Sequence, residues 1–371
     1  MSQQYHNAEE VAMNEESFAF YRYPYADEYV VMRQRDGEPC SLESYSDLDG
    51  KHGFVFAPFS ITGECPLLLL SPDVVEHRPV PADVDFVETP FVSRDIKAER
   101  RRYGDDFAKF HSRLGSGAFG KIVLSRRSEE RQLSALDVER LFVRACRLYP
   151  RMFIALVSTR RGGTWLMSTP EILVESKDGR LHTMSVAGTM EIGAEDTDES
   201  LMERKRASDI SEWSRKNIKE QQYVLRYITD CLQGLSFDVS VEGPYTLRAG
   251  MVKHLASDFF FSLKPGCNIG DVINTLHPTP AICGMPKAET YDFILANESS
   301  KRAYYSGFAG PLNCDEGTHL YVTLRCMEIG DGYCRLYAGG GLLSDSVEEN
   351  EWLETEAKME TMRRCLAIKR I

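Results

Sequence analysis

Apolar residues change their spacing several times along the chain, and each spacing predicts a different kind of element. Up to about residue 95, short apolar runs such as EYVVMRQ (28–34) and PLLLLS (66–71) alternate with Pro, Gly and Asp, which indicates strands joined by turns. Residues 96–114 are rich in charge and have helical periodicity, and GSGAFG (115–120) ends them. A strand over 121–127 and a helix opened by the N-cap candidate Ser134 are expected next.

The rest of the chain predicts runs of strands with helices grouped between them. Strands are expected over 152–159, 164–168, 171–176 and 181–188, and then near Phe237, Thr246, Ala303, Leu320 and Cys334. Helices are expected over 199–235, 271–276, 286–296 and 347–368. This grouping favours an α+β fold over a doubly wound sheet. The sequence shows no internal repeat and no obvious linker.

Composition narrows the class of protein. The 371 residues are 43% hydrophobic and 27% charged, which is enough for a large core. The net charge of −12 comes without a basic stripe, so nucleic-acid binding is not expected. The ten cysteines include no CxxC pair, and no apolar run approaches the roughly 20 residues of a membrane span. The polar N-terminus lacks a signal-peptide core, and we expect a cytoplasmic protein with no membrane partner.

A glycine pattern after the first long helix, Gly115-x-Gly117-x-x-Gly120, is typical of loops that cradle phosphate groups. The other protein-kinase signatures are absent from the sequence: the V-A-I-K lysine, the H-R-D loop and the D-F-G triplet. A lone glycine pattern is weak support. We therefore interpret it as a turn between a helix and a strand.

Two segments about sixty residues apart carry the strongest chemical signal. They are LHPTPAICGMPK (276–287) and YAGGGLLSDSVEENEWLETEAKM (337–359). In the second, Glu351 and Glu354 follow a glycine run and lie three residues apart on a predicted helix. Residues with this spacing share a helix face, so the two carboxylates can converge on one cation.

Together with other blocks in the same order, these segments resemble the chorismate-utilising enzymes, which include anthranilate synthase component I, and among them the isochorismate synthases. The other blocks cover 121–126, 168–175, 185–189, 216–224, 252–257, 298–310 and 321–329. We expect a single domain over 1–371, with divergent strands over 1–95 and the family-matching catalytic region over 100–371. The resemblance implies an α+β fold in which a large β-sheet sandwich encloses a deep pocket and helices pack outside.

The resemblance implies two catalytic residues. Lys121 stands where isochorismate synthases carry the lysine that activates water, and where ammonia-using relatives carry glutamine. A lysine base needs its pKa lowered by burial or by nearby cations. Glu171 matches the glutamate that acts as general acid when the C4 hydroxyl leaves, a role that requires a raised pKa. Taken alone, each residue would be interpreted as a solvated strand residue.

Two further positions favour water over ammonia as the nucleophile. Ala187 stands where aminodeoxychorismate synthases have a lysine that forms a covalent adduct, which alanine cannot do. The loop LHPTPA (276–281) matches the isochorismate and salicylate synthase form, whereas ammonia-using relatives have a P-x-G-T-x-x-G-x-P-K form. No glutaminase subunit is therefore expected. Many relatives without one are monomers, although the sequence itself does not specify the oligomeric state.

The resemblance also implies a Mg²⁺ ion held by Glu220, Glu351 and Glu354. A sparse set of carboxylates suits a hard, octahedral cation. The alternative is that these glutamates lie on exposed helix faces, paired with Lys219 or Lys358.

The substrate would be held by cations and by backbone donors. Arg325 matches the arginine that binds the enolpyruvyl carboxylate. The further candidates are Gly188, Thr189, His277, Tyr305, Gly340, Gly341 and Lys358, of which His277 shapes the loop or hydrogen-bonds the substrate. The chain departs from the family pattern beside Glu220, with Gln221 in place of histidine and Asn217 where relatives often carry an acid.

The reaction implied is the Mg²⁺-dependent conversion of chorismate to isochorismate, by attack of water at C2 and loss of the C4 hydroxyl. A salicylate synthase, which then eliminates pyruvate, is an alternative that no residue separates. Anthranilate synthase component I fits less well because it uses ammonia, and a non-catalytic chorismate-binding protein is the alternative from another class. The sequence does not tell whether the product feeds menaquinone, siderophore or salicylate biosynthesis.

Overall fold

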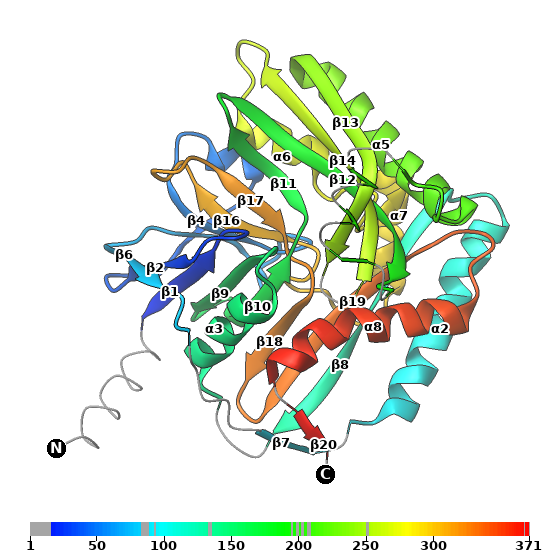
Figure 1. Cartoon of the computed structure of the whole chain (residues 1–371), viewed down its shortest axis with the longest axis horizontal. Helices are drawn as coiled ribbons and strands as arrows, with labels where there is room; N and C mark the ends of the chain where they lie inside the picture. Colours follow the sequence, from blue (N-terminus) through cyan, green and yellow to red (C-terminus); the bar gives the residue numbers. More distant parts are fainter. Residues whose placement is uncertain are drawn as a thin grey trace.

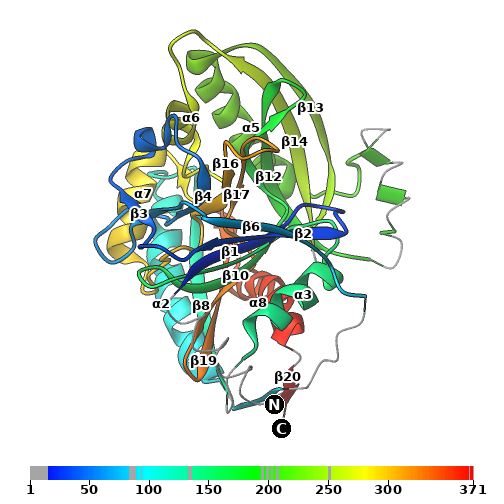
Figure 2. The ribbon, with the colours of Figure 1, turned by 90° about the vertical axis from the view of Figure 1, so that its left-hand side faces the viewer.

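The computed structural model describes residues 16–82, 89–92, 94–132, 136–193, 196–197, 200–201, 204–205, 209–249, 252–366 and 368–370. Within these residues the chain forms two large sheets that face each other, with helices on their outer sides (Figures 1 and 2). The strand pairs are antiparallel, apart from one parallel pair at the edge of the first sheet. This is the α+β sandwich that the sequence predicts.

The first sheet carries the strands nearest both ends of the described chain. Its order is β20 (Ile368–Arg370), β7 (Thr89–Val92), β8 (Lys121–Gln132), β19 (Tyr333–Leu342), β18 (Cys326–Gly330), β10 (Gly163–Thr169), β9 (Phe153–Thr159), β1 (Ser17–Arg22), β2 (Glu28–Gln34) and β6 (Val74–Pro79). The short strand β15 (Gly284–Met285) pairs with the start of β8. The long antiparallel pair β8–β19 lies at the bottom of the pocket described below.

The second sheet has the order β13 (Ser236–Ala249), β14 (Val252–Leu263), β12 (Arg180–Glu191), β11 (Ile172–Lys177), β17 (His319–Val322), β16 (Phe308–Leu312), β4 (Gly53–Ala57), β5 (Leu67–Leu70) and β3 (Cys40–Leu42). The N-terminal strands thus complete both sheets, because β1 pairs with β9 and β4 pairs with β16. Aromatic rings join the sheets: Phe153 of the first stacks on Tyr321 of the second, with ring centroids 4.2 Å apart.

Helices cover the outer faces. Helices α5 (Arg215–Leu235) and α6 (Ile269–Leu276) pack on the second sheet, whereas α3 (Val138–Leu148) and α8 (Glu348–Leu366) pack on the first. Helices α2 (Ile96–Gly115) and α7 (Lys287–Asn297) share a further core with β8 and β19, and η1 (Tyr45–Leu48) is a short 3₁₀ turn beside α6. No helix of the described residues is both long and apolar enough to cross a membrane.

The predicted elements mostly match; the differences are shifted boundaries and one strand that is not formed. Helix α3 begins after Asp137, whose carboxylate accepts from the Arg140 N–H; the predicted cap Ser134 lies outside the described residues. The helix predicted over 199–235 is interrupted: residues 200–201 and 204–205 are helical, but α5 itself begins at Arg215 after a Ser214 cap. The strand predicted near Ala303 is wrong, because that residue lies in a turn with φ +51° and β16 starts only at Phe308. Residues 116–120 form the turn between α2 and β8, as predicted.

Candidate active site

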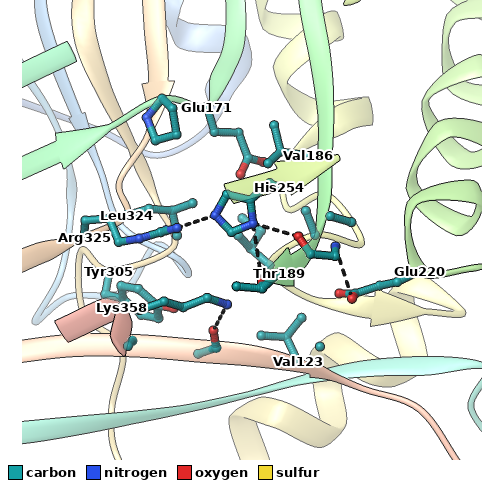
Figure 3. A pocket seen from close by; sticks show the side chains of 18 of the residues that line it. Val123, Glu171, Val186, Thr189, Glu220, His254, Tyr305, Leu324, Arg325 and Lys358 are labelled. Carbon is teal, nitrogen blue, oxygen red and sulfur yellow. Dashed lines mark hydrogen bonds between the residues drawn. The ribbon is translucent and has the colours of Figure 1, made fainter. Parts of the chain in front are cut away.

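A pocket lies between the two sheets, lined by β12 and β14 on one side and by β19 and the start of β8 on the other (Figure 3). Its polar lining consists of Glu171, Thr189, Glu220, Tyr305, His254, Arg325 and Lys358. The backbones of Gly188, Gly339 and Gly341 also face it. Most residues that the sequence singles out for substrate or metal are therefore brought together, although they come from segments up to 170 residues apart, from Gly188 to Lys358.

The glycine run of β19 lets helices α5 and α8 bring carboxylates against the sheet. A Cβ at Gly341 would lie 2.1 Å from Glu220 Oε1, a distance that no real side chain tolerates. A Cβ at Gly340 would lie 3.1 Å from Glu351 Oε2 and 3.5 Å from Glu354 Oε1. Glycine at position 341 is thus required for the close approach of Glu220, whereas a side chain at position 340 would crowd Glu351 without excluding it.

Each of the three glutamates is paired with a lysine. Lys121 Nζ lies 3.0 Å from Glu220 Oε1, Lys216 Nζ lies 2.5 Å from Glu351 Oε1, and Lys358 Nζ lies 2.6 Å from Glu354 Oε1. Glu220, Glu351 and Lys121 are buried, with 9%, 1% and 0% of their surface exposed. The interpretation as exposed helix faces is therefore wrong, although the predicted pairing of Glu354 with Lys358 is present.

The carboxylates fit a divalent cation, although their lysine partners stand among them. No group of three acidic, histidine or cysteine side chains in the described residues forms a ready-made metal cluster. Glu351 Oε2, however, is buried without a hydrogen-bond partner among those residues, and it shares the space over Gly340 with Glu354 Oε1. An orphaned carboxylate oxygen beside a second one is a site where a hard cation would be stabilised.

The two α8 carboxylates influence each other. Burial, followed by the neighbouring charge of Glu354, raises the pKa of Glu351. Burial acts the same way on Glu354, but the adjacent ammonium of Lys358 outweighs it and holds that pKa below its ordinary value. Glu351 is consequently the carboxylate that gains most from a further positive charge.

Glu171 immediately precedes β11 and enters the pocket from the second sheet (Figure 3). Burial raises its pKa to about 7, and the positive charges of Arg325, Lys121 and Lys358 offset this only in part. Its backbone is fixed because the Val322 N–H donates to the Glu171 carbonyl at 2.9 Å. A carboxyl group with this pKa can donate a proton at neutral pH, which is what a general acid must do.

His254 was missed as a functional residue, although the block 252–257 contains it. Its Nδ1–H donates to the Gly188 carbonyl at 2.8 Å, and its Nε2 accepts from the guanidinium of Arg325. Burial, then the charges of Arg325 and Lys358, hold its pKa well below the ordinary value. His254 is therefore a neutral imidazole that orients Arg325. The Nε of Arg325 is buried and has no partner among the described residues, so it remains free to bind an anion.

The backbone of Gly188 connects Glu220 to His254. Its N–H donates to Glu220 Oε2 at 3.2 Å, while its carbonyl accepts from His254. Its φ is +73°, and a Cβ there would lie 3.0 Å from the Cβ of Asn217. Only glycine fits this position. Gln221 points away from the pocket and donates to Ser185 Oγ at 2.8 Å, so it serves packing between α5 and β12.

His277 lies outside the pocket lining. Its ring packs edge-on against Tyr45 and Phe308, and burial lowers its pKa to about 3. Its carbonyl accepts from Lys287 Nζ at 2.7 Å. The same loop continues to Ala281, which does line the pocket. Two roles are expected for His277, shaping the loop or hydrogen-bonding the substrate; this packing fits the first, and the second stays a prediction.

A family model described as "Chorismate binding enzyme" matches residues 80–367. The chain belongs to this family. Its match begins directly after β6 and includes every element that lines the pocket.

Curated relatives of this chain include two isochorismate synthases. MenF of Escherichia coli (strain K12) is 28% identical over 256 residues, which cover 68% of this chain and 57% of the relative. DhbC of Bacillus subtilis (strain 168) is 28% identical over 268 residues, which cover 70% of this chain and 66% of the relative. Anthranilate synthase component 1 of Methanothermobacter thermautotrophicus is 26% identical over 310 residues, 80% of this chain and 64% of the relative. The chain thus matches about half to two thirds of the length of these relatives.

Solved structures share the fold. DhbC from Bacillus anthracis, described as a 2,3-dihydroxybenzoate-specific isochorismate synthase, has a TM-score of 0.77 at 22% identity, and the match covers 98% of this chain and 100% of that one. The menaquinone-specific isochorismate synthase MenF from Escherichia coli has the same TM-score at 20% identity, covering 94% and 88%. The predicted α+β sandwich is therefore confirmed.

Proposed function

We propose that this chain is an isochorismate synthase, an isomerase that converts chorismate to isochorismate with the help of Mg²⁺. The observation that carries the proposal is Glu171, a buried pocket residue whose pKa is raised to about 7, together with the buried Lys121, whose positive charge acts on it. Lys121 belongs to β8 of the first sheet, whereas Glu171 precedes β11 of the second. Chemistry that takes a proton on one side of a ring and gives one on the other needs such a pair.

The charges of the pocket suit a small molecule with two carboxylates. Arg325 is buried and makes no ion pair among the described residues, and its Nε points to no protein acceptor there. Lys358 adds a second cation, held at 2.9 Å from the Gly339 carbonyl. Chorismate carries two carboxylates, and an arginine fork can bind one of them through two parallel hydrogen bonds.

The proton movements balance between the two residues. Lys121 would accept a proton from the water that attacks C2, the ring double bonds would shift, and Glu171 would give its proton to the C4 hydroxyl as it leaves as water. Glu220, Glu351 and Glu354 would hold Mg²⁺, which when bound supplies positive charge that positions a substrate carboxylate. One C–O bond would form at C2 while another breaks at C4, so bonds of similar type are exchanged and the reaction should be reversible. A proton would return from Lys121 to Glu171 through solvent before the next turnover.

The identities of the relatives leave the pathway open. One relative, 29% identical over 271 residues, is named as a salicylate biosynthesis isochorismate synthase of Pseudomonas aeruginosa, and others are named for menaquinone or 2,3-dihydroxybenzoate. All three uses begin with isochorismate, which is the product proposed here. Since Lys121 stands where ammonia-using relatives have glutamine, we propose that no glutaminase subunit is needed.

The test is product analysis by chromatography, with purified protein, chorismate and Mg²⁺, in the presence and absence of ammonium. Isochorismate formed independently of ammonium supports the proposal, and Lys121→Gln should abolish its formation. Salicylate with pyruvate would identify a salicylate synthase, and an aminated product would identify an anthranilate synthase. Binding of chorismate without turnover would identify a non-catalytic binding protein.

A further inference from the structure

The three lysine–glutamate pairs of the site differ in how they can respond to a ligand. The side chain of Lys121 is 0% exposed, that of Lys358 is 11% exposed and that of Lys216 is 30% exposed. Lys121 and Lys358 also have proposed roles, as the base and as a cation that binds the substrate. Lys216 lies in the first turn of α5, and its described contact is with Glu351 in the first turn of α8. The Lys216–Glu351 ion pair is therefore the one whose lysine can move into solvent.

Lys216 occupies one oxygen of the carboxylate that would hold the cation. Its Nζ lies 2.5 Å from Glu351 Oε1, while Glu351 Oε2 faces the space over Gly340. Mg²⁺ binds carboxylate oxygens at about 2.1 Å, so it would lie no more than about 7 Å from the Lys216 ammonium, whichever oxygen it takes. Two cations this close repel each other strongly in a partly buried site.

The balance of charge adds a second argument. Glu351 and Glu354 face Lys216 and Lys358, so these two ion pairs are neutral before any ligand enters. A divalent cation that arrives alone leaves two positive charges in excess. A substrate with two carboxylates would cancel both excess charges. Movement of one lysine into solvent would remove one of them. The lysine with a route to solvent is Lys216.

We propose that Lys216 is a built-in competitor of the divalent cation: it neutralises Glu351 in the metal-free enzyme and swings into solvent when the cation binds. Lys216 thereby sets how much Mg²⁺ the enzyme requires and couples cation binding to the arrival of the dianionic substrate. This inference rests on the proposed function, because it assumes that Glu351 and Glu354 are cation ligands.

The test measures cation binding without substrate, at a pH of about 8, from the electron paramagnetic resonance signal of free Mn²⁺, with Mg²⁺ as competitor. Lys216→Gln should bind Mn²⁺ about tenfold more tightly than the unaltered protein. Lys219→Gln is the matched control, since it removes the same charge from an exposed position on the same helix. It should change the dissociation constant less than about twofold. Lys216→Arg keeps the charge and should keep the weak binding.

The outcomes separate this inference from the proposed function. Equal or weaker Mn²⁺ binding by Lys216→Gln, in a variant whose thermal unfolding shows that it is folded, would overturn the competitor role. Lys216→Met, which keeps the apolar stem, gives the same comparison if the glutamine variant does not fold. If the unaltered protein, Lys216→Gln and Glu351→Gln all bind no Mn²⁺, the cation site of the proposed function fails as well. Chorismate should tighten Mn²⁺ binding more in the unaltered protein than in Lys216→Gln.

Discussion

Glu171 and Glu175 lie four residues apart at β11, and both are buried, yet their surroundings drive their pKa values in opposite directions. Burial raises the pKa of Glu171 to about 7. Burial also acts on Glu175, but hydrogen bonds from His182 and His319 outweigh it and lower its pKa to about 2. Depth in the protein therefore does not decide the charge of a carboxylate; hydrogen bonds to its ionised form do.

The two glutamates belong to clusters of different kinds. Glu175 is part of a chain in which His182 Nδ1 donates to it at 2.8 Å and His182 Nε2 donates to Asp258 at 3.1 Å. Tyr245 also donates to Asp258, at 2.9 Å. These contacts tie β11, β12, β13 and β14 together and leave the carboxylates satisfied.

The pocket cluster is incomplete by comparison. Arg325 Nε and Glu351 Oε2 are buried without partners among the described residues, and no hydrogen bond to the Glu171 carboxylate occurs there. Buried polar groups normally find partners, so atoms left without them are those a ligand would satisfy. The contrast separates a cluster that holds strands together from one that is prepared for chemistry.

The largest expected effect is the loss of turnover in Glu171→Gln. Glutamine keeps the shape but cannot donate a proton to the leaving hydroxyl, so kcat should fall roughly 10²- to 10⁴-fold. Steady-state kinetics with chorismate would measure this, and thermal unfolding would show that the fold persists. Activity within threefold of the unaltered protein would remove Glu171 from the mechanism and break the contrast with Glu175.

The matched variant, Glu175→Gln, should lower stability and leave kcat almost unchanged. It leaves His182 and His319 with a neutral partner in a buried cluster, which we expect to cost about 2–4 kcal/mol of unfolding free energy. Because Glu175 does not line the pocket, kcat of the folded enzyme should change little. Urea unfolding followed by fluorescence measures the stability. A large loss of kcat without loss of stability would contradict the structural role.

The pH dependence of stability should differ in sign between the two variants. The pKa of Glu171 is raised in the folded protein, so its unfavourable contribution grows as the pH rises from about 4.5 through about 7. The pKa of Glu175 is lowered, so its contribution is present above about 4.5 and is lost as the pH falls towards about 2. Relative to the unaltered protein, Glu171→Gln should therefore gain about 1–3 kcal/mol between pH 5 and 8. The deficit of Glu175→Gln should shrink below pH 4.5. Urea unfolding at several pH values tests both signs.

The sequence predicts the helices and strands of this site better than it predicts which of them contact each other. The spacing of Glu351 and Glu354, the glycine run before them and the helix near 96–114 are local patterns, and the structure shows each as expected. The start of α5 was misplaced because charged residues before it are good helix formers, while the Ser214 side chain, which accepts from the Asn217 N–H, sets the true boundary.

Residues that act through distant partners were not predictable in the same way. His254 and Lys216 lie in blocks with ordinary strand and helix patterns, and their importance depends on Arg325 and Glu351, which are 71 and 135 residues away. The N-terminal strands likewise show no motif, because their role is to pair with strands more than 100 residues distant, as β1 does with β9. Periodicity specifies the face of an element but not its tertiary neighbour.

The smallest expected effect, and the finest test of the contrast, is that of His319→Gln. Burial disfavours the charged imidazole, but the hydrogen bond to Glu175 at 3.1 Å outweighs it and raises the pKa of His319. The stability that this pair contributes is therefore fully present below about pH 6.5 and is lost as the pH rises through the raised pKa. The variant should lose about 1 kcal/mol at a pH of about 5.5 and less at about 8.5, since the side chain is 17% exposed and partly screened. Equal losses at both pH values would mean that His319 supports Glu175 by packing against Tyr23 rather than by its charge.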